Sequence, residues 1–347
     1  MVDLNNIPSF DQLPKFHDQT GCAWDVWGRD DQLGTVNLLT EDVSLQNYRL
    51  GKMVCLNWPI NFPEKPAFSR QTPVIHSWKK GDHVNDDSIS INTQSGSQWD
   101  GLKHFGVEAQ KVFYQNTPTD FFFRGQFHIG DPSNIDQERI KYGIHNWSQH
   151  GICGRGVLID LVSYYEKNKG ALPYDPWTTH PIPLQDILDC AKSQGVTFEQ
   201  ADILLLRVGF IQKYNSTTQE TRDSLCRKPE TFAGIEQTED MKRFLWSAVL
   251  LLLLSVGITD SIGDRDNHFA AIASDQPALE RWPPPAGTPH LHQTLLPLWG
   301  MPIGEFFDLE KLSTTCKETG RYTFFFSSWP LNILGGVASP PNAAAYF

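Results

Sequence analysis

Residues 94–104 bring together side chains that could do chemistry. Gln94 and Gln98 carry carboxamides, which both donate and accept hydrogen bonds. Asp100 supplies an anion, and the imidazole of His104 titrates near neutral pH. Because side chains alternate between the two faces of an extended strand, these four even-numbered positions would share one face. We therefore predict a convergent polar site, with a solvated surface strand and turn as the alternative.

The same residues resemble the metal-binding motif of the cyclase family, which includes bacterial-type kynurenine formamidases and isatin hydrolases. That motif reads His-x-Gly-Thr-His-x-Asp-x-Pro-x-His. Asp100 falls on its aspartate ligand and His104 on its final, catalytic histidine, whereas Gln94 and Gln98 stand where two histidine ligands would be. Residues 93–101 are similar to the fungal-type branch, which often reads Thr-Gln-Ser-x-Ser-Gln-Trp-Asp-Gly here.

The resemblance extends over most of the chain. His292 and Glu305 are similar to the last two metal ligands of the family, one residue further apart than in the formamidases. The family's fold is a single-domain swivelling β/β/α fold of the α/β class, and its members usually form homodimers or homotetramers. On this resemblance we expect one domain over residues 1–347. The other similar stretches are residues 23–39, 151–160, 201–209 and 330–342.

The resemblance implies a hydrolase of the arylformamidase type, which cleaves an amide, formamide or lactone bond of a small aromatic or natural-product substrate. Asp100, His292 and Glu305 would hold one or two divalent metal ions, manganese or zinc, which lower the pKa of a bound water so that hydroxide attacks a carbonyl. His104 would shuttle the proton. Because amide oxygens are poor zinc ligands, Gln94 and Gln98 favour a harder ion and a weaker site.

Two other hypotheses stay open. One is a metal-independent cyclase or lyase acting on a polyketide or another secondary-metabolite intermediate. Its acid and base would be His104 with Asp100. His292 with Glu305 is the alternative pair. The two glutamines would then bind a substrate carbonyl, each well-placed donor contributing about 3 kcal/mol. The other hypothesis is a family member that has lost its metal and binds a ligand without catalysis.

Additional candidates surround these motifs. Trp24, Trp27 and Trp99 could wall a substrate site, although packing is the commoner role of a tryptophan because an indole buries a large area. Asp275 and Glu280 could add acidic groups near the last motif, with a solvated loop as the alternative. The proline-dense loops 61–70 and 282–289 are typical of the mouths of sites.

Composition limits the class of protein. The chain has 347 residues, of which 40% are hydrophobic, enough to bury one large core or two modest ones. Its formal net charge of −11 argues against nucleic acid as a partner, because that binding requires Lys and Arg. The six cysteines form no CxxC pair, and the N-terminus shows no secretory signal. We expect reduced cysteines, a cytoplasmic location and a small-molecule substrate.

An apolar run, residues 248–254, continues to residue 258 and is closed by charged residues. It is shorter than the roughly 20 residues that a membrane-spanning helix needs, so we expect no membrane anchor. Relative to the family, residues 247–266 are an apparent insertion. It could be a retained intron or a genuine additional helix.

Hydrophobic periodicity predicts an α/β pattern of elements. Apolar residues at 184, 187, 188 and 191 have the spacing of an amphipathic helix, which Gly195 would end. Three runs rich in apolar or β-forming residues predict buried strands. These runs are residues 156–162, 203–208 and 322–326.

Overall fold

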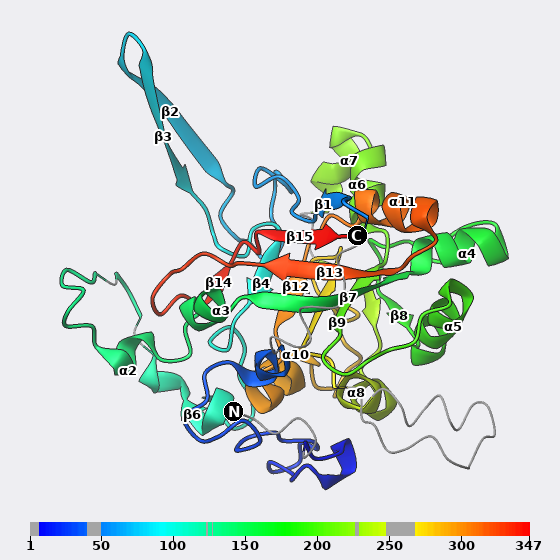
Figure 1. Cartoon of the computed structure of the whole chain (residues 1–347), viewed down its shortest axis with the longest axis horizontal. Coiled ribbons are helices and arrows are strands. Elements are labelled where there is room, and N and C mark those ends of the chain that lie inside the picture. Colours follow the sequence, from blue (N-terminus) through cyan, green and yellow to red (C-terminus); the bar gives the residue numbers. More distant parts are fainter. Residues whose placement is uncertain (1–6, 40–49, 123, 127, 226–228, 248–267) are drawn as a thin grey trace.

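The computed structural model describes residues 7–39, 50–122, 124–126, 128–225, 229–247 and 268–347. Within them, a nine-stranded sheet crosses the molecule in the order β1-β15-β13-β7-β9-β11-β12-β4-β14 (Figure 1). The central strands β7, β9, β11 and β12 are parallel, and antiparallel strands flank them. In sheet order the strands are Met53–Cys55, Ala343–Tyr346, Thr323–Ser328, Ile152–Asp160, Ile203–Arg207, Ala271–Ser274, Ile303–Glu305, Gln98–Asp100 and Ala338–Ser339.

Helices pack beside this sheet, which confirms the predicted α/β class. The helix α5 (Leu184–Gln194) contacts both β7 and α4 (Leu161–Lys169). The other α-helices are α2 (Gln137–Ile140), α3 (His145–His150), α6 (Phe210–Ser216), α7 (Gln219–Ser224), α8 (Glu239–Trp246), α10 (His292–Thr294) and α11 (Glu310–Thr319). The short 3-10 turns are η2 (Phe10–Gln12), η3 (Gly34–Leu38), η4 (Tyr114–Asn116) and η5 (Thr119–Phe121), and η6 (Leu295–Trp299) is a π-helical turn.

The helix α5 confirms the prediction from periodicity. Its buried residues include Leu184, Ile187 and Ala191, which form the predicted apolar face. Gly195 ends the helix in the left-handed conformation, at a φ of 66°, where a side chain would be strained. Both the buried face and the last turn of this helix are therefore as predicted.

Two of the three predicted buried strands are close to what we expected. All residues of β9 are buried, and β7 is buried from its fifth residue onward. In β13, by contrast, burial alternates, with Phe324 and Phe326 in the core and Phe325 half-buried. Complete burial was the wrong prediction for this strand, because β13 lies in the antiparallel part of the sheet, where one face can remain open.

A long β-hairpin projects from the body of the molecule (Figure 1). It consists of β2 (Val74–Gly81) and β3 (Val84–Ser90), which pair only with each other in the described chain. Nearly all of its residues are exposed, including the large apolar side chain of Trp78. The remaining two-stranded pairs are β5 (Val112–Phe113) with β6 (Thr117–Pro118), and β8 (His180–Ile182) with β10 (Ala233–Ile235).

The apolar run and the apparent insertion at residues 247–266 lie, apart from Ser247, outside the described residues. Among the helices of the described residues, none has the length and apolar character required to cross a bilayer.

Candidate functional site

The site is built on β4, a strand of three buried residues in the sheet. Alternation along β4 points Trp99 into the core, where its ring packs 5.0 Å from that of Phe307. Gln98 and Asp100 therefore point to the opposite face. The register of β4 with β12 places Gln98 directly across from Glu305, and Gln98 Nε2 donates a hydrogen bond to Glu305 Oε2 at 2.9 Å. A carboxylate from each strand thus lies on one face.

Gln94 and His104 reach this face from the turns on either side of β4. The strand is shorter than our prediction from alternation assumed, and these two residues fold back toward it. Gln94 Nε2 donates a hydrogen bond to Asp100 Oδ1 at 2.6 Å, and it lies 2.9 Å from His104 Nδ1. Gln98 Nε2 also donates to Asp100 Oδ1, at 2.9 Å. The two amides therefore fix the orientation of this carboxylate and occupy one of its oxygens.

His292 enters from the other end of the chain, at the first residue of α10. A π-helical turn follows immediately, a local irregularity that is often found at functional sites. His292 Nδ1 lies 2.7 Å from Glu280 Oε1, and the same carboxylate accepts the backbone N–H groups of Leu291 and His292. Glu280 thereby fixes the imidazole so that its Nε2 faces Glu305 and Asp100.

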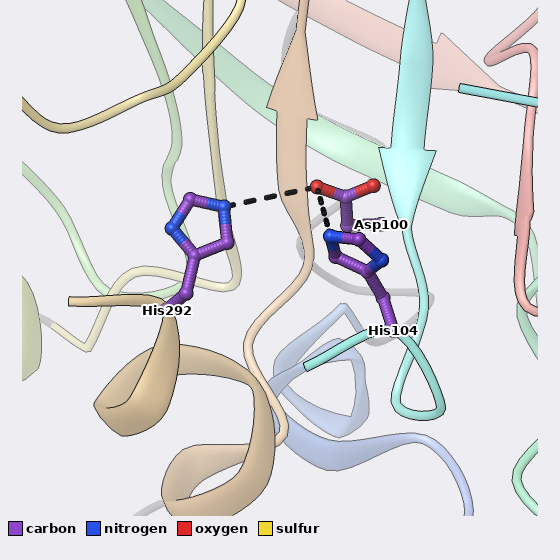
Figure 2. A group of neighbouring side chains, drawn as sticks. All are labelled: Asp100, His104 and His292. Carbon is purple, nitrogen blue, oxygen red and sulfur yellow. Dashed lines mark ion pairs between the residues drawn. The ribbon is translucent and has the colours of Figure 1, made fainter. Parts of the chain in front are cut away.

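Asp100, His104 and His292, three members of the resulting cluster, have the donor set of a cation site (Figure 2). Asp100 Oδ2 lies 3.8 Å from His104 Nε2 and 3.9 Å from His292 Nε2, and Glu305 Oε1 lies 3.4 Å from His292 Nε2. Ligands of one tetrahedral ion are about 3.4 Å apart when each bond is about 2.1 Å. Asp100 Oδ2 is buried and accepts no hydrogen bond from the described residues. Among the described residues, the donor atoms of Asp100, His104 and His292 all lie within 4.8 Å of one another, so this group fits a divalent metal ion. Glu305, which we predicted as a ligand, adjoins the group through His292.

Burial and mutual charge set the protonation of this cluster. Burial lowers the pKa of His104 to about 4, against the opposing charge of Asp100. Burial, together with the charge of Asp100, raises the pKa of Glu305 to about 7. Burial by itself lowers the pKa of His292, but hydrogen bonds and charges from Glu280 and Glu305 raise it to about 10. The carboxylates therefore favour the protonated, positively charged form of His292. A cation bound beside them would supply positive charge at the same place.

A cavity of about 200 Å³ opens onto the cluster. His104, His292 and Glu305 form its polar end. Its remaining walls are Phe68, Arg70, Phe105, Pro277, Ala278 and Trp282. Phe68 and Arg70 of loop 61–70 and Trp282 of loop 282–289 thus line the cavity, where we predicted that these loops would form the mouth of a site.

The other predicted site residues have definite places. Gln98 is fully buried beneath the cluster, and Gln94 is partly buried beside it. The indole N–H groups donate to core acceptors: that of Trp24 to Pro297 O, that of Trp27 to Trp299 O and that of Trp99 to Ser328 Oγ. In the described structure, the aromatic walls of the cavity come from other residues.

Sequence reasoning did not single out Arg70, Phe68, Phe105 or Trp282. Arg70 and Phe68 belong to a loop that only its prolines marked, and Phe105 has no signal except that it follows His104. Glu280 was identified only as a nearby acidic group. Its contact with His292 depends on a turn between residues 280 and 292 that no local pattern predicts.

Comparisons with known proteins identify the family and support the fold. The family model described as "Putative cyclase" matches residues 39–279. A crystal structure described as a novel cyclase is 26% identical, has a TM-score of 0.73, and covers 94% of this chain and 99% of its own. Isatin hydrolase A from Labrenzia aggregata has a TM-score of 0.50 at 12% identity, over 85% of this chain and 93% of its own. The enzyme of that name from Ralstonia solanacearum has a TM-score of 0.51 at 12% identity, over 85% and 91%. No curated protein matches the chain.

Proposed function

Because the chain belongs to the cyclase family, we propose that it is a metal-dependent hydrolase that cleaves an amide, formamide or lactone bond of a small aromatic substrate. A single observation carries the proposal. Asp100 Oδ2 is buried, has no hydrogen-bond partner in the described structure, and faces the imidazoles of His104 and His292. A buried carboxylate oxygen without a hydrogen bond destabilises the folded protein unless a cation binds it or a proton neutralises it.

Asp100, His292 and Glu305 would hold the ion. Carboxylate and imidazole donors without a thiolate suit manganese or zinc. The glutamines that replace two histidines of the family motif take a supporting role, because the nitrogens of their amides point at Asp100 Oδ1. They orient the carboxylate and leave Oδ2 for the ion, as the groups around metal ligands commonly do.

His104 is the general base and acid in this proposal. Its side chain is 20% exposed and lines the cavity, whereas the side chains of Asp100, His292 and Glu305 are 6% exposed or less. Its low pKa keeps the imidazole neutral near pH 7, so that its unprotonated ring nitrogen can accept a proton from the attacking water. The same nitrogen then returns the proton to the leaving nitrogen or oxygen. A bound divalent ion supplies Lewis acidity and a nucleophilic water near neutral pH.

Elemental analysis of the purified protein, followed by an assay on N-formylkynurenine and formanilide, tests the proposal. We expect one or two equivalents of a divalent ion and activity that a chelator removes. Asp100→Ala should lose the ion and lower kcat/KM by more than about 100-fold, because it removes a ligand rather than a supporting group. Asp82→Ala, at the exposed turn of the hairpin, is the matched control and should change neither.

Full turnover by metal-stripped protein would overturn the proposal. It would instead support the metal-independent cyclase, in which His104 and Asp100 act as acid and base without an ion.

A further inference from the structure

Arg70 is the only Lys or Arg among the described residues that line the cavity. Its Nη1 donates to the backbone carbonyl oxygen of Gln94 at 2.7 Å and, more weakly, to Gln98 Oε1 at 3.4 Å. Both contacts use one nitrogen, so within the described structure Nε and Nη2 remain for a ligand. A guanidinium presents its donors as a planar fork that matches a carboxylate.

The loop that carries Arg70 is held in an unfavourable backbone conformation. Phe68 and Ser69 have φ values of 59° and 56°, in the left-handed region that residues with a side chain seldom occupy. Phe68 N–H donates to Glu230 Oε1 at 2.6 Å, which anchors the loop. Consecutive residues of this kind persist where surrounding contacts impose them, most often at functional sites. Here they direct the Phe68 ring and the Arg70 guanidinium to the same cavity.

Aromatic rings form the walls beside Arg70. The Phe68 ring packs edge-on to Trp282 at 5.2 Å between centroids. The guanidinium carbon of Arg70 stacks over the same ring, 5.0 Å from its centroid. Phe105 packs against His292 at 5.4 Å, at the polar end. The cavity of about 200 Å³ is smaller than most sites for drug-sized ligands but exceeds the roughly 150 Å³ that holds one benzene. These walls suit a single planar ring.

The positive charge of Arg70 would allow the cavity to bind an anionic group. The carboxylate of Glu305 lines the polar end of the cavity beside the imidazoles of His104 and His292, and the whole chain carries a net charge of −11. A carboxylate that enters beside Glu305 is stabilised where a cation lies close to it. Arg70 supplies that cation at the wall, where the ring of such a molecule would also find aromatic contacts.

We propose that Arg70 binds a carboxylate of the substrate, so that the cavity selects a single-ring aromatic acid whose scissile carbonyl lies toward Asp100 and His104. The selection rests on the proposed hydrolase function, but the binding of the acid does not require turnover.

Calorimetric titration of the full chain with benzoate and with benzamide tests this inference, because the two molecules share a ring and differ in charge. We expect benzoate to bind the native protein about tenfold more tightly than benzamide, the difference typical of one charge-assisted hydrogen-bonded pair. Arg70→Gln should remove this preference and leave benzamide binding within about twofold of the native value. Arg70→Lys should restore only part of it, because the planar fork is lost.

Two controls distinguish binding at Arg70 from a general charge effect and from binding at a metal ion. Arg29→Gln changes the same charge on an exposed side chain and should leave both affinities unchanged. Metal-stripped native protein tests whether the carboxylate binds an ion instead, and the preference for benzoate should persist there.

The inference fails if neither molecule binds, if the two bind equally, if Arg70→Gln weakens both alike, or if the preference survives in Arg70→Gln but disappears after metal removal. Because the binding of benzoate requires no turnover, an acid-selective protein that lacks hydrolase activity would refute the proposed function alone.

Discussion

In the proposed mechanism, Glu280 acts only through His292, which it holds by hydrogen bonds. It accepts three hydrogen bonds from His292 and the adjacent backbone, and Gln237 Nε2 donates a fourth at 2.7 Å. Burial alone would raise the pKa of Glu280, but the hydrogen bond and the charge of His292 lower it below its usual value. A carboxylate in this position keeps an imidazole oriented and basic for an ion.

We therefore expect Glu280→Gln to lower the affinity of the protein for its divalent ion by about 10- to 100-fold. The amide retains the size of the side chain but loses the negative charge that stabilises His292. Competition with a chromogenic chelator measures the affinity directly. Glu318→Gln, on the surface, provides the matched control. Equal affinities for all three proteins would show that His292 needs no such partner.

The resemblance to a known family, rather than spacing alone, predicted much of the candidate site. Asp100, His104, His292 and Glu305 were identified by their similarity to a family motif, and the structure brings all four together. Arg70 could not be predicted in this way, because its place depends on a loop conformation with unusual φ values. Such conformations are imposed by distant contacts and leave little trace in the local sequence.

At the scale of elements, the reactive face depends on how closely three strands approach each other. Gly304 lies in β12 between β11 and β4, at a register position across from Trp99. A Cβ atom there would lie 2.6 Å from Ala273 Cβ and 2.9 Å from Trp99 Cζ3. Real Cβ atoms do not approach other atoms so closely, so β12 would have to move. Glu305 is the next residue and would move with it.

Gly304→Ala should therefore lower the free energy of unfolding by about 1–3 kcal/mol, as overpacked cores do, and should also lower metal affinity. Urea denaturation followed by tryptophan fluorescence measures the first effect, and chelator competition measures the second. At Gly81 in the hairpin, a Cβ atom would meet nothing within 4 Å, so Gly81→Ala is the control. A native-like unfolding midpoint for Gly304→Ala would contradict the close packing described here.

Periodicity predicted those elements whose burial follows one simple rule. The helix α5 has one apolar face, and β9 is buried on both sides, so their sequences show these patterns plainly. In β4, by contrast, only three residues form the strand, and the segments on either side are turns. The convergence of Gln94 and His104 thus arises from two turns that bring the chain back, which alternation alone does not predict.

For the whole molecule, buried titratable groups couple folding to pH. His268 is 2% exposed, and its ring packs 5.3 Å from that of Trp246. Burial lowers the pKa of His268 to about 4, against the effect of a hydrogen bond with the Trp246 backbone. In the unfolded chain the same group has a pKa of about 6.5. Between these two values only the unfolded state binds the proton, so stability falls as pH decreases.

We expect His268 to make the free energy of unfolding decrease between pH 7 and pH 4 by up to about 3 kcal/mol. Urea denaturation at several pH values measures this slope. His268→Gln removes the titrating group and should flatten the slope, whereas His83→Gln, on the exposed hairpin, should leave it unchanged. A parallel decrease in native protein and in His268→Gln would assign the acid sensitivity to other groups.

The projecting hairpin lies between Arg70 and Gln94, two residues that are distant in sequence but close in space. Arg70 enters it and Gln94 leaves it, and one hydrogen bond of 2.7 Å joins the guanidinium of the first to the backbone of the second. The intervening residues form the hairpin and its connections, and the chain returns to this hydrogen bond after them. The hairpin can therefore gain or lose residue pairs at its tip without changing this hydrogen bond. The cavity wall that Arg70 forms would then keep its dimensions.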